Sequence, residues 1–162
     1  MADDNGIIAD LEASIVTALA AITVSGNAAF RSVDNWHFQI TGPDSFQKYA
    51  PFAFVEYAGD SMVSVEGDHE ILGRFLFIVR MGVEITKGKH GIARIGKGTN
   101  AKRLQLGISK LRDVVITALQ DVLLATTSGD VERAEYIKSD FVWSMPFQAG
   151  IVMQFAIDRI GA

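Results

Sequence analysis

The strongest structural signal in this chain is an eleven-residue run in which apolar side chains occupy every second position. From residue 75 to residue 85 the odd positions are all apolar, whereas the even positions include Arg80, Gly82 and Glu84. Successive side chains of a β-strand point to opposite faces of its sheet. The run therefore predicts a strand that places one face on a hydrophobic core.

Two other segments have the spacing of amphipathic helices. The first carries Ile8, Leu11, Ile15, Leu19 and Ile22 at steps of three and four residues; residues 3–5 offer capping side chains, and residues 25–27 end the pattern. The second carries Leu104, Ile108, Leu111, Val115, Leu119 and Val122. We expect this second helix to begin after a cap at Thr99 or Asn100 and to run to about Ala125.

The remaining segments predict further strands and a loose region. Pro51 precedes a compact strand at 52–57, and residues 131–160 hold one or two strands, the last of which alternates from Ile151 to Arg159. Residues 27–50 are expected to be loosely structured, with a short strand at 36–40 and a turn at Gly42-Pro43-Asp44.

This order of elements predicts one domain over residues 1–162. The fold class is α+β: a largely antiparallel or mixed sheet of at least four strands, with two long helices packed on one face. The chain has no cysteine, so disulfides and thiolate metal sites are excluded. Its acidic start lacks the basic region of a secretory signal, and we expect a soluble protein that is intracellular where it is made.

Positive charge is concentrated in one segment of an acidic chain. The net charge is −4, yet residues 87–112 contain eight basic residues and no acidic one. The glycine-rich part of this segment, 87–100, predicts a long flexible loop. Lys102 and Arg103 are expected in the first turn of the second helix, where they oppose the helix dipole. An acidic neighbouring subunit or nucleic acid would offset that cost, and a solvated surface loop is the plain alternative.

Three patterns that suggest an enzyme lack the partners that the chemistry needs. Gly91 to Lys97 matches the start of a phosphate-binding loop, but Gly98 stands where a Ser or Thr must bind magnesium. Residues 57–61 resemble the nucleophile block of GDS-type esterases, but no histidine follows His90 to act as the base, and a plain turn is expected there. Asp68-His69-Glu70 has no second histidine at the spacing of a metal site. We therefore expect no enzyme activity, no cofactor and no metal.

The layout as a whole resembles the small tail terminator, or tail-completion, proteins of long-tailed phages, especially the Mu-like prophage branch. The resemblance rests on an amphipathic N-terminal helix, the Pro51-initiated strand, the alternating strand at 75–85, a loop leading to a helix at 102–123 and a closing strand at 151–159. It covers about residues 7–160 and rests on length, order and pattern.

The resemblance implies an α+β structural protein of the virion tail that assembles in the host cytoplasm. Such proteins form hexameric rings that cap the tail tube, end its polymerisation and present the surface for head joining. The implied partners are further copies of the chain, the tube protein, and sheath or head–tail connector proteins, with DNA only passing through the ring. The predicted contact residues are Lys87, Lys89, Arg94, Lys97, Lys102 and Arg103.

Two further readings remain open beside this one. The chain could be another ring or tube component of a phage tail or head–tail junction. It could also be a phosphate- or nucleic-acid-binding module that uses the basic segment 87–112, although no aromatic residue is interleaved with the basic ones.

Overall fold

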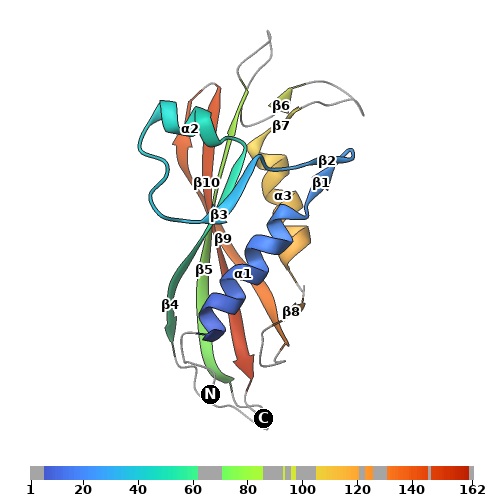
Figure 1. Cartoon of the computed structure of the whole chain (residues 1–162), viewed down its shortest axis with the longest axis vertical. Coiled ribbons are helices and arrows are strands. Elements are labelled where there is room, and N and C mark those ends of the chain that lie inside the picture. The colour runs from blue at the N-terminus through green and yellow to red at the C-terminus, as the bar shows by residue number, and fades with distance from the viewer. Residues whose placement is uncertain are drawn as a thin grey trace.

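The fold is built on one six-stranded sheet, described here from a computed structural model. The structure describes residues 6–61, 71–85, 93, 96–97, 105–120, 123–125, 131–145 and 147–160. The sheet order is β3-β4-β5-β10-β9-β8, and its strands run along the long axis of the molecule (Figure 1). The bounds are β3 (Ser32–Asn35), β4 (Phe52–Ser61), β5 (Ile71–Glu84), β8 (Leu123–Ala125), β9 (Val131–Ser144) and β10 (Gln148–Ile160).

The sheet is mixed, because only β3 and β4 pair in parallel and the other four pairings are antiparallel. Three helices accompany it: α1 (Gly6–Ala20), α2 (Pro43–Tyr49) and α3 (Ile108–Leu119). Two small hairpins, β1 (Thr23–Val24) with β2 (Asn27–Ala28) and β6 (Gly96–Lys97) with β7 (Gln105–Leu106), complete the described elements. The α+β class is therefore confirmed.

The main core lies between one face of the sheet and the pair α1 and α3. The odd positions of β5 from Phe75 to Ile85 are buried there, as the alternation predicts. Leu11, Ile15 and Leu19 of α1 face the same core, and α3 adds four buried side chains, Ile108, Leu111, Val115 and Leu119. The helical spacing thus identifies the buried face of both helices correctly.

A second, smaller core lies on the opposite face of the sheet, under α2. Phe46 of α2 packs with Phe52 and Phe54 of β4, and half-buried Trp143 of β9 stacks on the Phe46 ring at 5.7 Å. Two paired glycines, Gly82 of β5 and Gly150 of β10, form the floor. A Cβ at position 82 would lie 2.4 Å from Phe52 Cε1 and 2.6 Å from Phe46 Cζ, so the rings occupy the space of a side chain.

Several sequence-based boundaries are wrong. The second helix begins at Ile108 after an extended Gly107, and it ends where Gln120 becomes extended, with ψ 132°. Residues 105–106 are paired in β7 and residues 123–125 in β8, so neither stretch is helical. Lys102 and Arg103 therefore precede the helix by more than a turn, and the argument that they oppose its dipole no longer holds.

The region from 27 to 50 is also more ordered than expected. The strand is Ser32–Asn35 and not 36–40, because Phe38 has a positive φ of 64° that turns the chain. Gly42-Pro43-Asp44 begins a helix instead of forming a free turn, and a proline in the first helical turn is compatible with that start. Residues 57–61 belong to β4, with a bulge between Tyr57 and Gly59; the φ of Gly59 is 116°.

The close contact at Gly82 gives a stability test. We expect Gly82→Ala to lower the free energy of unfolding by about 1–3 kcal/mol, because the added methyl group must displace two aromatic rings. The measurement is urea unfolding followed by circular dichroism. Gly6→Ala is the matched control, since nothing lies within 4 Å of a Cβ there and a helical alanine is favoured. Equal midpoints for the two variants would contradict the packing described.

Candidate protein-docking surface

Exposed apolar side chains gather on the hairpin formed by β9 and β10. Among the described residues, six large apolar side chains are exposed, and five of these lie between residues 137 and 147: Ile137, Phe141, Val142, Met145 and Phe147. The sixth is Phe38, at 75% exposure. No residue from 141 to 147 is charged. We call residues 141–147 the apolar hairpin. Exposed apolar side chains that lie together make this hairpin a candidate interaction surface.

The backbone of this hairpin is held firmly to the sheet. The Ile85 N–H donates to the Phe147 carbonyl at 2.8 Å, and the Met145 N–H donates to the Gln148 carbonyl at 2.8 Å. The Gln148 amide donates to Glu84 Oε2 at 2.6 Å and accepts from Trp143 Nε1 at 3.2 Å. Because the frame is fixed, the exposed side chains are presented to a partner without a large ordering cost.

Bulges in β9 determine which side chains point outward. The pairing of β9 with β10 shifts between Gly150 and Ile151, so Val142 has no direct partner across the ladder. Trp143 on one side of it pairs with Gly150 and stacks on Phe46, whereas Val142 remains 60% exposed. A bulge adds one residue to a strand and changes the direction of its side chain.

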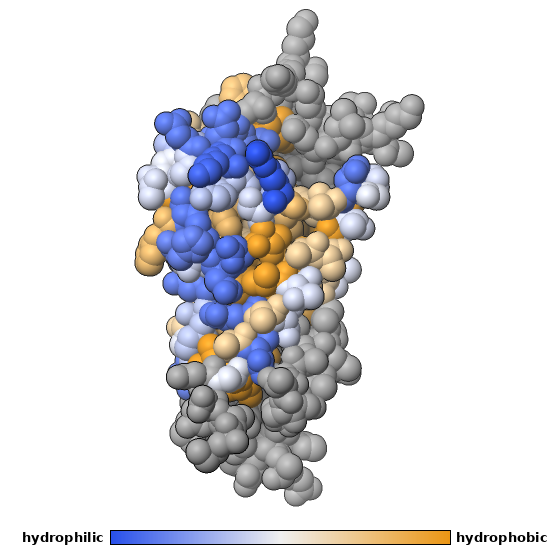
Figure 2. All heavy atoms as spheres, viewed as in Figure 1, coloured by the Kyte–Doolittle hydropathy of each residue, from blue (hydrophilic) through white to orange (hydrophobic). Residues whose placement is uncertain are grey.

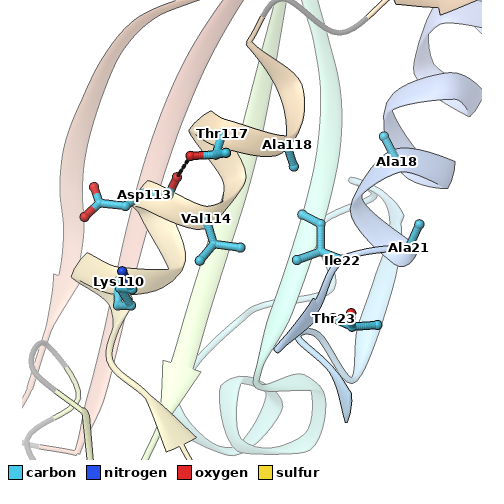
Figure 3. Close-up of a pocket in the computed structure, with 9 residues that line it drawn as sticks. All are labelled: Ala18, Ala21, Ile22, Thr23, Lys110, Asp113, Val114, Thr117 and Ala118. Atoms are coloured by element: carbon cyan, nitrogen blue, oxygen red, sulfur yellow. Dashed lines mark hydrogen bonds between the residues drawn. The ribbon is translucent and has the colours of Figure 1, made fainter. Parts of the chain in front are cut away.

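A second apolar feature is a groove between α1 and α3, on the face of the molecule opposite α2. It has a volume of about 440 Å³ and is lined by Ala18, Ala21, Ile22, Thr23, Lys110, Asp113, Val114, Thr117 and Ala118. Ile22 and Val114 point toward each other across it, while Lys110 and Asp113 lie on the side of α3 farther from α1 (Figure 3). Figure 2 shows an apolar area in the middle of the face on which the two helices lie.

The sheet face under α2 differs from the hairpin, because ion pairs cross its strands. Arg80 donates to Glu56 Oε2 from two nitrogens, at 3.1 and 2.7 Å, and its guanidinium lies 4.9 Å from the Trp36 ring. Arg74 contacts Asp158 with two bonds at 2.7 and 3.0 Å. The hydrogen bonds from Arg74 to that carboxylate raise the pKa of Arg74 above its ordinary value and so favour the charged guanidinium.

Arg112, the last residue of the basic segment 87–112, contacts residues of both α3 and β9. It donates to Ser139 Oγ at 3.1 Å, to the Tyr136 hydroxyl at 3.0 Å and to Asp113 at 2.8 Å, and it lies over the Tyr136 ring. The hydrogen bond with Tyr136 raises its pKa. Arg112 therefore joins α3 to β9 through one hydrogen bond from each of its three guanidinium nitrogens.

None of the six predicted contact residues can be placed at the apolar hairpin from the described part of the chain. Lys87, Lys89, Arg94, Lys102 and Arg103 lie outside the described residues, and for Lys97 the structure gives only the backbone, in β6. Within the predicted loop, Ala93 is buried in the main core and its carbonyl accepts from the Ile108 N–H at 2.8 Å. At least this point of the glycine-rich segment is tied to the start of α3.

Within the described residues, the fold does not bring a catalytic base or further metal ligands to the enzyme-like patterns. The Asp60 carboxylate accepts the Tyr57 hydroxyl, and Asp68-His69-Glu70 lies outside the described residues. His37 contacts Asn35 and Gln39 in an exposed turn. Over the described ranges, no three His, Asp or Glu side chains are grouped so that they could hold a metal ion. No described helix is long and apolar enough to cross a membrane.

Sequence reasoning missed the apolar hairpin, although its signal is present. Residues 141–147 combine five large apolar side chains with no charge. An alternation rule assigns each strand residue to one of two faces, so it cannot show which of these side chains remain exposed in the folded chain.

Comparison with known proteins adds no family assignment: no model of a protein family matches the chain, and no curated protein matches it.

The first test asks whether the apolar hairpin contributes to stability. We expect Phe147→Ser to change the free energy of unfolding by no more than about 0.5 kcal/mol, because that side chain is half exposed. Phe77→Ala, in the core, is the contrasting variant and should cost about 3–5 kcal/mol. Both are measured by urea unfolding. A large loss with Phe147→Ser would mean that the hairpin is part of the core and not a free surface.

The second test concerns Tyr57 at the end of β4. Burial, together with the hydrogen bond to Asp60 and its charge, raises the pKa of Tyr57 to about 12 from an ordinary value of 10.0. The neutral phenol is therefore favoured in the folded state, and this stabilisation is present below pH 10 and is lost as the pH rises through about 12.

Absorbance of the phenolate over an alkaline titration measures this pKa, and Tyr57→Phe identifies its contribution among the three tyrosines. We expect Asp60→Ala to lower the pKa of Tyr57, because both the acceptor and the charge are removed. Asp44→Ala, an acidic residue at the start of α2, is the control and should leave the titration unchanged. The same titration curve in the Asp60→Ala protein would disprove the contact.

Proposed function

We propose that this chain is a structural subunit of a phage tail, a terminator that caps the tail tube as a ring. The observation that carries the proposal is the apolar hairpin, an exposed and firmly anchored surface suited to binding protein. The resemblance to tail terminator proteins supplies the particular assembly. The ring has six subunits, ends tube growth and offers its outer surface to the head.

The distribution of interacting groups supports a binding role in preference to catalysis. The described polar side chains that are buried all have hydrogen-bond partners, so none is held ready for a substrate. Among the described residues, a shifted pKa is found for three groups. They are Arg74, which pairs with Asp158 across two strands, Arg112, which joins α3 to β9, and Tyr57 near the end of β4. Burial and the contact with Asp60 cause the shift of Tyr57, and hydrogen bonds within the fold cause those of Arg74 and Arg112.

A ring also requires two different complementary surfaces on each subunit. The apolar hairpin lies at the same end of the sheet as α2, whereas the groove between α1 and α3 lies on the helical face (Figure 1). One chain therefore carries two distinct apolar surfaces, which is the minimum for a closed ring of identical subunits.

The proposal is tested by the mass of the assembly in solution. We expect light scattering to give a monomer or a weak hexamer for the chain alone, and a discrete ring when tube protein is added. Phe147→Ser should remain folded and lose ring formation, since the apolar contact is weakened. Ala9→Ser, an exposed change on α1, is the control and should assemble like the unmodified chain.

Electron microscopy of the same samples separates the related possibilities. Short rings or capped tubes support a terminator. Long cylinders formed by the chain alone would identify a tube subunit instead. A stable dimer that tube protein does not change would count against any ring component. Strong, salt-sensitive binding to DNA in place of assembly would favour the nucleic-acid module.

A further inference from the structure

We infer that the free edge of β9 pairs with the same edge of a second copy, antiparallel about a two-fold axis at Ser139, so that the two sheets join into one. The inference goes beyond the proposed function and does not depend on it, because it concerns free chains before any assembly. The occupant of the edge is thus a defined strand of a second identical chain, centred on residues 138–140.

Residues 135–144 of β9 form a sheet edge in the described part of the chain. β8 pairs only with residues 131–133, and Gln120 bridges Ala134. Beyond Ala134, β9 has no outer neighbour among the described strands. A strand edge presents its backbone N–H and C=O groups in a row, and the group that matches such a row is another extended strand. The chemistry of the edge therefore fixes the class of its partner.

At the opposite edge of the sheet, the chain bonds outward-facing backbone groups with its own side chains. The Asn35 N–H of β3 donates to Asp34 Oδ1 at 2.8 Å, and the Asn35 carbonyl accepts the Gln39 amide at 2.7 Å. In the part of β4 that β3 does not cover, the Tyr57 N–H donates to Glu12 Oε1 at 3.1 Å. Among the described residues, none caps the backbone of residues 138–140 in this way. A second strand is therefore expected at β9 and not at β3 or β4.

The bulges of β9 restrict regular pairing to a short stretch. The register shifts leave Ile137 and Val142 without a direct partner in β10, whereas residues 138–141 pair continuously with residues 151–154. A two-fold axis perpendicular to the sheet keeps each face on its own side. Such an axis must pass through a residue, because side chains alternate between the faces and only those on one face can meet. Within the regular stretch the inner positions for the axis are Ser139 and Asp140.

The charges of β9 select Ser139 as the centre. Lys138 and Asp140 lie on the face away from the main core and form an exposed ion pair at 3.2 Å within the strand. With the axis at Ser139, each Lys138 faces Asp140 of the second copy and keeps its own Asp140 beside it, so four charges alternate in sign. With the axis at Asp140, two carboxylates face each other directly, which is unfavourable.

The contact is weak and limited to two copies. Its regular stretch has four residues, and the ion pairs are exposed, with side chains 55% and 60% accessible, so pairing requires a high protein concentration. A two-fold contact is isologous: the same patch of each copy is used, and no third copy can be added at that edge. At low concentration the chain remains a monomer.

Cysteine cross-linking tests the register, since the natural chain contains no cysteine. In the Ser139→Cys protein the two thiols face each other, so we expect a short bismaleimide to give covalent dimers at high protein concentration. Ser144→Cys, another exposed position of β9, is the matched control. Its two thiols would be separated by about ten residues of the ladder, or about 33 Å, which a short linker cannot span. Circular dichroism checks that both variants are folded. Equal yields at the two positions would overturn the inference.

Two charge reversals, each made in the Ser139→Cys protein, test the self-complementarity. Lys138→Glu leaves two negative side chains on the strand, and Asp140→Lys leaves two positive ones. We expect either variant alone to lose about three- to tenfold in dimer yield, because like charges meet. A mixture of the two variants should recover the yield, since each strand then faces the opposite sign.

This recovery cannot come from a change within one chain, because in each variant positions 138 and 140 carry the same sign. A mixture that cross-links no better than the two variants do separately would show that the strands do not pair about Ser139, and the inference would be abandoned.

Discussion

The antiparallel pairing of β5 with β10 is the constraint on which the rest of the structure depends. It joins thirteen residue pairs at the centre of the sheet, from Gln148 with Glu84 to Ile160 with Ile71. A strand register places each side chain on one face or the other, so a shift by one residue would turn the main core outward. The register fixes the odd positions against α1 and α3 and aligns Gly82 with Gly150. That glycine pair in turn accepts Phe46 of α2.

The packing of α2 against the sheet connects the centre of the fold to the candidate docking surface. Phe46 lies on the glycine pair and stacks with Trp143 of β9, which is part of the hairpin. Gln148 extends the same link, because its amide contacts Glu84 at the end of β5 and the Pro43 carbonyl at the start of α2. The exposed apolar side chains thus project from a frame set by the centre of the sheet.

The sequence predicts those parts of the fold in which the spacing of apolar residues alone determines which side chains are buried. The alternation at 75–85 and at 151–159, and the stripe of α1, predict buried residues correctly because neighbours along the chain share one environment. Boundaries of α3 depend on tertiary pairing: residues 105–106 and 123–125 enter strands although they continue an apolar pattern.

The candidate docking surface could not be predicted in the same way. The basic residues are conspicuous in the sequence, but the described candidate surface consists of uncharged residues. Their exposure depends on how strands that are distant in the sequence are arranged. Whether Lys87, Lys89, Arg94, Lys97, Lys102 and Arg103 contact a partner stays a prediction.

The two outer strands of the sheet are short: β3 has four residues and β8 has three. An unpaired strand edge is a template for adding a strand from another molecule, and long exposed edges lead to open-ended aggregation. β8 pairs only with residues 131–133 of the fourteen-residue β9, and beyond residue 134 β9 has no outer neighbour among the described strands. The backbone of β9 there offers groups that a strand from another molecule can pair with, next to the exposed Phe141 and Val142 side chains. The bulges that interrupt β9 in the same stretch limit how far such pairing extends.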